Sequence, residues 1–214
     1  MPSAAADTAP ADDRNAEAAL AALREELRGR NDLPPYAALA TQPVFGEGPI
    51  GAPLMLVGEQ PGDEEDRQGR PFVGPAGRLL DRALAEAGIE RAKTYVTNAV
   101  KHFKFVPRGK RRLHQSPDAG DIAYYRPFLV REIAIVHPRL LVALGATALR
   151  ALAGRPLTIT RTRGLDGLRT PEGVPFRATV HPSYLLRLPD AESAAREYER
   201  FVADLRSAKE AAGA

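Results

Sequence analysis

The chain has 214 residues, no cysteine and a formal net charge of +3, and 44% of its residues are apolar. This length and composition suit one substantial α/β domain with a real core. The absence of cysteine excludes disulfides, thiolate metal sites and cysteine nucleophiles. No apolar run approaches the roughly 18 residues of a membrane span, and the stretch MPSAAADTAPADDRNAE lacks the features of a secretory signal, so we expect a cytoplasmic protein.

The expected elements alternate between strand and helix. We expect a disordered tail over residues 1–16 and a single domain over 17–210. Short apolar runs bounded by Gly, Pro or polar residues predict strands, and 3.6-residue apolar patterns predict helices. Strand alternating with helix indicates an α/β fold with a mostly parallel sheet covered on both faces. In chain order the elements are a strand over 54–58, a helix over 75–88, strand 94–98, helix 118–136, strand 140–145, helix 146–153, strand 176–181 and helix 190–208.

Polar side chains follow the carboxyl ends of the predicted strands. Glu59 and Gln60 come directly after the first strand, Asn98 ends the second, GAT follows the third and His181 ends the fourth. Ligands of open α/β folds bind at this edge of the sheet. The loop GEQPGDEEDRQGRPFVGPAG (58–77) has neither the P-loop nor the dinucleotide spacing, so we do not expect a bound nucleotide cofactor there. The sequence therefore predicts a site at one rim of the sheet.

Four residues at this rim are candidates for ligand contacts, and two of them, Phe72 and Asn98, also have a plainer reading. Phe72 lies between small neighbours, where it could stack on a planar base or simply close the core. Asn98 carries a donor and an acceptor, which matches the edge of a pyrimidine, although it could be an ordinary turn residue. His181 could donate to a ligand carbonyl, and Ser183 could hold a phosphate.

Charge is segregated along the chain. Six Lys or Arg and no acidic residue lie between Lys101 and Arg112, whereas Glu59 to Asp66 holds five carboxylates. This pattern predicts one surface for a polyanion and an acidic site close to it. The stretch GKRRLHQSP (109–117) places His114 directly after this basic run, in what we expect to be a loop. Taken alone, the stretch is typical of a solvated charge run with an incidental histidine.

Several motifs in fixed order carry a family resemblance. GEQPGDEED with PFVGPAG, then YVTNAVKHFKF, then LGATA, then HPSYLLR resembles the family-4 branch of the uracil-DNA glycosylase superfamily over about residues 40 to 205. The KRRLH stretch is similar to the KRR-x-H loop of its UdgX type. The resemblance implies a three-layer α/β/α sandwich around a four-stranded parallel sheet. It also implies a DNA repair protein that flips uracil out of DNA into a pocket.

The resemblance further implies roles for individual residues. Phe72 would stack on uracil and Asn98 would read its edge, with Gln60 and Asp63 beside them. His181 would contact a uracil carbonyl, and Glu59 would stabilise the cationic sugar or activate its attacker. The resemblance to the UdgX type implies a loop histidine that acts as a nucleophile and captures C1′ covalently. By its position in the motif this residue is His114. A neutral imidazole is a competent nucleophile at pH 7. The resemblance thus implies a single-turnover glycosylase, with DNA phosphates held by Lys110, Arg111, Arg112 and Ser183.

The chain departs from the family at the iron–sulfur cluster. The cluster positions of the UdgX type, three Cys and one His, fall on Asn31, Pro34, Tyr125 and His102, so only the histidine remains. One imidazole cannot hold a cluster that needs about four ligands, chiefly thiolates. We therefore expect no cofactor and no metal, with Tyr125, Pro34 and neighbouring apolar groups packing the vacated space.

Two other functions stay open at this point. One is a glycosylase that turns over freely, releasing uracil and abasic DNA, in which His114 only positions water or phosphate. The other is a binder of uracil or abasic DNA without activity. The expected partner is uracil-containing DNA, taken as single-stranded, and a monomer is expected because no segment shows an oligomerisation stripe.

Overall fold

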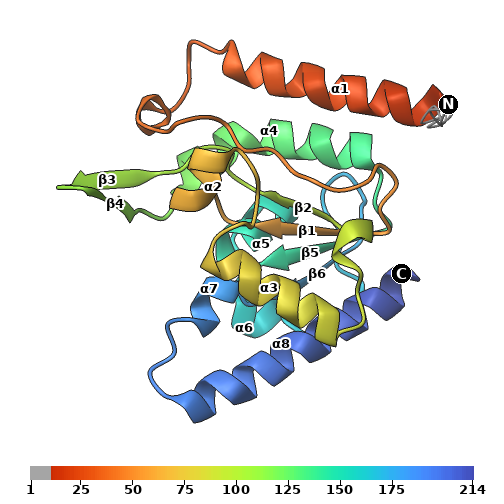
Figure 1. The fold of residues 1–214 in the computed structure, drawn as a ribbon. Coiled ribbons are helices and arrows are strands. Elements are labelled where there is room, and N and C mark those ends of the chain that lie inside the picture. Colours follow the sequence, from red (N-terminus) through yellow and green to blue (C-terminus); the bar gives the residue numbers. More distant parts are fainter. Residues whose placement is uncertain (1–10) are drawn as a thin grey trace, which may run out of the picture.

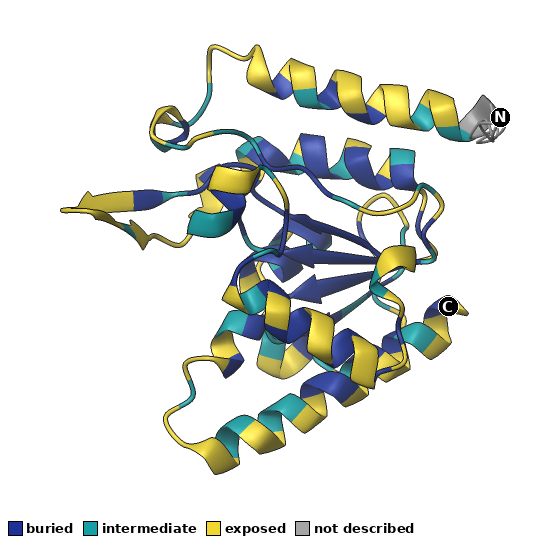
Figure 2. Cartoon of the chain, in the orientation of Figure 1, coloured by how far each residue is buried: buried dark blue, intermediate teal, exposed yellow. Residues whose placement is uncertain are grey.

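The centre of the molecule is a four-stranded parallel sheet. A computed structural model describes residues 11–214 of the chain. The sheet has the order β2-β1-β5-β6 (Figure 1). Its strands confirm the four predicted ones to within two residues at each end, and β1, β2 and β5 are buried throughout (Figure 2), as parallel strands covered on both faces must be. The strands are β1 (Leu54–Gly58), β2 (Tyr95–Asn98), β5 (Leu140–Leu144) and β6 (Phe176–Thr179).

Helices cover both faces of this sheet. α3 (Pro75–Glu86) and α8 (Ala191–Ala212) lie on the face to which Leu56 points. α4 (Ala119–Val136) and α5 (Ala146–Ala153) lie on the other, against Met55 and Val57. Neighbouring residues of β1 reach opposite cores because side chains alternate along a strand. The expected three-layer α/β/α sandwich is confirmed.

An additional helix, α1 (Ala11–Arg28), packs on the outside of α4 (Figure 1). Leu23 and Leu27 on its inner side are fully buried in a cluster with Phe128. The predicted disordered tail over 1–16 is therefore wrong from residue 11 onward, and its first ten residues lie outside the described part. The signal that was missed is the spacing of Leu20, Leu23 and Leu27, which places three leucines on one helix face in an Ala-rich segment.

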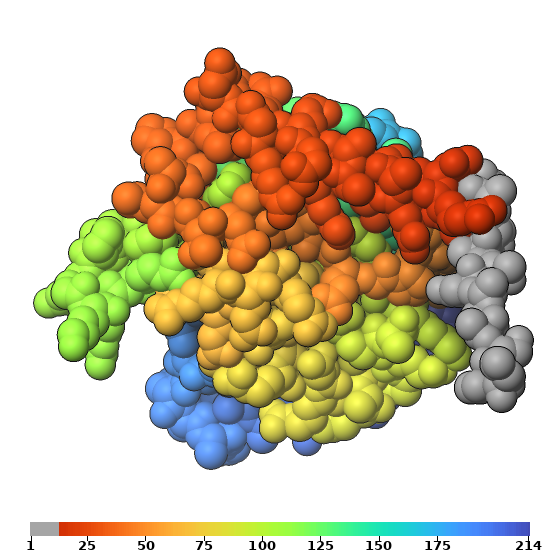
Figure 3. Space-filling view, turned by 45° about the horizontal axis from the view of Figure 1, so that its top comes forward, coloured from red at the N-terminus to blue at the C-terminus, as the bar shows by residue number. Residues whose placement is uncertain are grey.

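The basic stretch forms a β-hairpin and not the expected loop. β3 (Phe105–Arg108) pairs antiparallel with β4 (Arg111–His114). Gly109 starts the two-residue turn at a φ of 59°, the arrangement of a type II′ turn. The hairpin projects from the body of the molecule (Figure 3). His114 lies at its base, opposite Phe105, whereas Lys110 lies at the tip.

The remaining helical elements of the described residues are short. No helix of the described residues is long and apolar enough to cross a membrane. The short elements are η1 (Pro35–Ala38), α2 (Asp63–Gln68), η2 (Arg91–Lys93), α6 (Ile159–Thr162) and α7 (Pro182–Leu185).

Candidate active site

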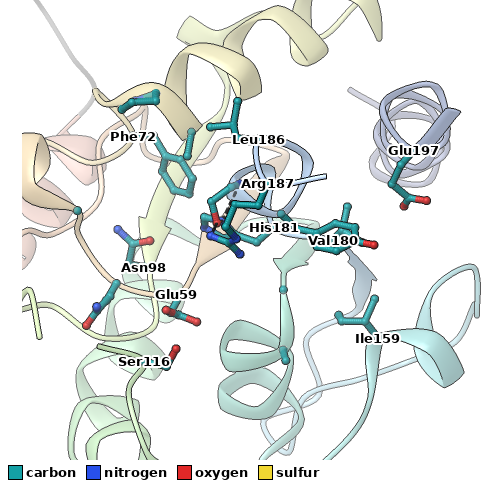
Figure 4. A pocket seen from close by; sticks show the side chains of 18 of the residues that line it. Glu59, Phe72, Asn98, Ser116, Ile159, Val180, His181, Leu186, Arg187 and Glu197 are labelled. Carbon is teal, nitrogen blue, oxygen red and sulfur yellow. Dashed lines mark hydrogen bonds between the residues drawn. The ribbon is translucent and has the colours of Figure 1, made fainter. Parts of the chain in front are cut away.

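A cavity of about 1380 Å³ opens where the strands of the sheet end. It is larger than a typical small-ligand pocket, which has room for roughly 300–1,000 Å³. Phe72, Asn98, Glu59 and His181 surround the same space in Figure 4. Of the residues proposed from the sequence, the cavity brings together Glu59, Gln60, Asp63, Phe72, Asn98, His114, His181 and Ser183, but not Lys110, Arg111 or Arg112.

Phe72 and Asn98 form one wall of the cavity over Gly58. A Cβ added to Gly58 would lie 2.4 Å from Asn98 Oδ1 and 2.6 Å from Phe72 Cζ, so only glycine leaves room for both side chains. Phe72 is only 6% exposed and belongs to the core, as its plainer reading expects, and it also lines the cavity. Its φ of 55° is a left-handed conformation that a bulky residue rarely adopts. Such strain is typical of positions held for function.

His181 is held in one tautomer. It is the N-cap of α7, and its Nδ1 accepts a hydrogen bond from the Ser183 backbone N–H at 3.1 Å. Desolvation lowers the pKa of His181 to about 4, so the ring is neutral at pH 7. A neutral ring that accepts at Nδ1 carries its proton on Nε2. His181 therefore offers an N–H donor from a neutral imidazole that lines the cavity.

Glu59 and His114 are in direct contact. His114 Nε2 lies 3.0 Å from Glu59 Oε1, which joins the base of the hairpin to the end of β1. The second oxygen, Glu59 Oε2, accepts a hydrogen bond from the Thr147 hydroxyl at 2.7 Å. Desolvation raises the pKa of Glu59, but the hydrogen bonds from His114 and Thr147 outweigh it and hold this pKa below its usual value. The site thus presents a carboxylate beside a histidine that is half exposed.

The side chain of Gln60 binds the hairpin. Its Oε1 accepts from the Lys104 backbone N–H at 3.0 Å, and its Nε2 donates to the backbone oxygens of Lys104 and Gln115 at 3.2 and 3.0 Å. Both amide hydrogens are thereby used at the two chain ends of the hairpin. Gln60 lines the cavity as predicted, but it also fixes the segment that carries His114.

The basic run does not form one surface. Lys101 is fully buried and bound to Glu132, Lys104 binds Asp118 and Asp121, and Arg112 binds Asp63 and Asp66. The prediction of six cations facing a polyanion is therefore wrong for these three. Arg112 points inward over the rings of Phe103 and Phe105. The exposed cations of this run are Arg108, Lys110 and Arg111.

Two contributions to this site were not predicted from the sequence. From the sequence, Thr147 has no role beyond its place in the triplet GAT after the third strand. Glu132 lies in α4, far along the chain, yet its carboxylate accepts from Tyr95, Thr97 and Lys101 behind the Asn98 wall. Lys101 Nζ in turn donates to the Asn98 backbone oxygen at 2.7 Å. Nothing in the sequence near Asn98 points to this buried network.

Comparison with known proteins decides the family. The family description "Uracil DNA glycosylase superfamily" matches residues 45–206, most of the chain. The chain belongs to the uracil-DNA glycosylase superfamily. It is similar to the type-4 uracil-DNA glycosylase of Thermotoga maritima, with 43% identity over 150 residues that cover 69% of this chain and 73% of the relative. It is also similar to those of Pyrobaculum aerophilum (36% over 170 residues, 77% and 83%) and Sulfurisphaera tokodaii (35% over 158 residues, 70% and 68%).

The cluster positions of this superfamily member do not fit an iron–sulfur cluster. His102 Nδ1 lies 2.7 Å from the Tyr125 hydroxyl, and Pro34 has no donor atom in its side chain. Tyr125 is fully buried among the apolar residues around Leu27 and Phe128. Within residues 11–214 no three His, Cys, Asp or Glu side chains are grouped so as to hold a metal ion. An Asn, a Pro, a Tyr and one occupied His are not the thiolate set that a cluster requires.

Proposed function

We propose that this protein excises uracil from DNA and retains the abasic sugar on His114. The observation that carries the proposal is the 3.0 Å contact between His114 Nε2 and Glu59 Oε1 inside the cavity. The superfamily membership and the similarity to type-4 uracil-DNA glycosylases support uracil-DNA glycosylase activity. The substrate is uracil-containing DNA, which we expect to be bound single-stranded by a monomer.

Base recognition follows from the cavity wall. Phe72 stacks on the flipped uracil, as aromatic side chains do with unstacked bases. The amide of Asn98 offers a donor and an acceptor to the adjacent carbonyl and N–H of the base. The Nε2–H of neutral His181 donates to a uracil carbonyl, where negative charge grows as the base leaves.

Bond cleavage takes place next to Glu59. The C1′–N1 bond breaks with its electron pair passing to uracil, which departs as an anion and is protonated by solvent. The sugar is left with oxocarbenium character. The Glu59 carboxylate, kept ionised by its hydrogen bonds, stabilises this cation from close by.

Capture uses the lone pair of His114. In the free protein Nε2–H donates to Glu59, so attack through Nε2 requires the other tautomer, with the proton on Nδ1. A sugar entering between the two side chains replaces their hydrogen bond and separates them. The lone pair then forms a bond to C1′, and the resulting imidazolium loses its proton to solvent or stays paired with Glu59. No water is consumed, and the product is a covalent protein–DNA adduct.

The chemistry proceeds without an iron–sulfur cluster. None of the steps above uses a metal, and the residues at the cluster positions form a buried His102–Tyr125 contact in its place. We propose that this contact stabilises the segment leading into the hairpin.

Denaturing electrophoresis tests the proposal. The protein is incubated with a labelled single-stranded oligonucleotide containing one uracil, beside a thymine control. We expect a shifted band that resists SDS and heat, with the mass of protein plus oligonucleotide minus uracil. His114→Ala and Glu59→Gln should both lose this band.

The other outcomes select the alternatives. Alkali-cleavable abasic product without a shifted band would establish a glycosylase that turns over, and would overturn capture by His114. Retention of uracil-containing DNA on a native gel with no product of either kind would leave a binder without activity. In each case the thymine oligonucleotide reports contacts that do not depend on uracil.

A further inference from the structure

Thr147 is joined to the candidate active site by a hydrogen bond to Glu59. It lies in the first turn of α5, directly after β5, and is 9% exposed. Its hydroxyl donates to Glu59 Oε2 at 2.7 Å. Its neighbours Gly145 and Ala146 line the cavity, whereas Thr147 is not among the lining residues.

The two oxygens of Glu59 have different partners. Oε1 faces His114 Nε2 and the cavity, and Oε2 faces Thr147 behind it. The last torsion of a glutamate side chain is broad, so one hydrogen bond alone leaves the carboxylate plane free to rotate. When a substrate replaces the His114 bond at Oε1, the Thr147 bond is the one that remains. An anchor on α5 therefore holds the carboxylate during the step in which it is needed.

We infer that Thr147 is a positioning residue for Glu59, whose carboxylate plane it fixes so that Oε1 faces the bound sugar. This inference rests on the proposed function in that it assigns Glu59 to the sugar. Nothing in the sequence around GAT assigns such a role, because Glu59 and Thr147 are 88 residues apart.

The hydrogen bond from Thr147 also affects the pKa of the Glu59 carboxyl. The titratable groups that face Glu59 are His114 from the hairpin and His181 after β6. Desolvation raises the pKa of Glu59, while the hydrogen bonds from His114 and Thr147 lower it. Removing the hydroxyl therefore raises this pKa. Because the ionised carboxylate is the active form, the fall in rate at low pH should begin at a higher pH.

The test compares Thr147→Val, which keeps the shape and loses the donor, with Thr147→Ser, which keeps the donor. The rate constant for uracil release is measured under single-turnover conditions across pH. We expect Val to lower the limiting rate between about tenfold and a hundredfold, the range for a lost hydrogen bond to a charged group. In this variant the fall in rate at low pH should begin at a higher pH, and the affinity for uracil-containing DNA should be unchanged. Ser should stay close to wild type.

Equal rates and equal low-pH limbs in the Val and Ser variants would overturn the inference. If the Val variant does not fold, Thr147→Ala removes the same hydroxyl with a residue that favours a helix. Thermal unfolding of each variant reports whether a loss of rate merely reflects a loss of structure.

A second measurement separates this inference from the proposed function. The pH titration of the Glu59 carboxyl carbon is followed by ¹³C NMR and assigned by its loss in Glu59→Gln. An upward shift in Val but not in Ser would support the Thr147 bond even if the wild type released no uracil. An active wild type with an unchanged carboxyl titration in Val would leave the proposed function standing and exclude Thr147 as the anchor.

Discussion

At the scale of single residues, Gly58 determines the shape of the base-binding wall. It is the last residue of β1, and both Phe72 and Asn98 occupy the space that its missing side chain leaves. Phe72 accepts a left-handed backbone to reach this place. Two side chains that are 26 positions apart in the chain, by their numbers, are thereby brought together over one glycine.

Gly58→Ala is expected to displace this wall. The added methyl would lie 2.4 Å from Asn98 Oδ1, so the amide or the ring must move. We predict that the affinity for uracil-containing DNA falls at least about tenfold, the scale on which misplaced polar contacts reduce discrimination. A fluorescence binding titration measures it. Gly29→Ala is the matched control, since its Cβ would meet only ordinary contacts from 3.5 Å.

At the scale of elements, the hairpin formed by β3 and β4 holds His114 beside Glu59. Gln60 holds its two ends, and Arg112 on its inner face binds the carboxylates of α2. Arg111 and Arg108 are a cross-strand pair and both are exposed. The neighbouring residues Arg111 and Arg112 thus lie on opposite faces of the hairpin, because side chains alternate between the faces of a strand.

Separate substitutions of Arg112 and Arg111 should affect different properties, stability for Arg112 and DNA binding for Arg111. Arg112→Gln leaves the buried carboxylate of Asp66 without its cation and should lower the free energy of unfolding by about 3 kcal/mol. Arg111→Gln should leave stability unchanged and reduce the salt dependence of single-stranded DNA binding by about one phosphate contact. Chemical denaturation and binding at several salt concentrations measure the two effects. A loss of stability in Arg111→Gln, with only DNA binding changed in Arg112→Gln, would refute these roles.

At the scale of the whole molecule, aromatic and apolar side chains pack together between α1 and α4. α1, the segment around Tyr36 and α4 meet there, and Tyr125 lies at the centre with its hydroxyl on His102. Desolvation lowers the pKa of His102 to about 4, so this ring is neutral at pH 7 and can accept from the tyrosine. The packing joins the outer helix layer to the start of the hairpin.

Tyr125→Phe should destabilise the molecule without affecting any metal. Loss of the hydroxyl leaves the His102 ring nitrogen unsatisfied, at a cost of about 1–3 kcal/mol in the free energy of unfolding. Denaturation curves of the wild type with and without an iron chelator should coincide. A chelator-dependent fall in stability would show that the chain holds iron after all.

Much of the fold followed from local pattern. The four strands of the sheet and the helices α3, α4, α5 and α8 were predicted, although α1 was not, because apolar runs and helical periodicity are properties of neighbouring residues. The hairpin was missed because Phe105 is the one buried residue of its two strands, so burial leaves no alternating pattern in the sequence. The polar rim was predicted for a topological reason: parallel strands end at one edge.

What the sequence by itself determined is the identity of the family and the residues gathered at that edge, since motifs and strand ends are written in order along the chain. What only the tertiary structure decided is which atoms face each other. The pairing of His114 with Glu59, the anchoring of Glu59 by Thr147 and the burial of Lys101 with Glu132 all join distant segments. Such contacts depend on how the elements pack against one another, and this packing cannot be predicted from the spacing of residues along the chain.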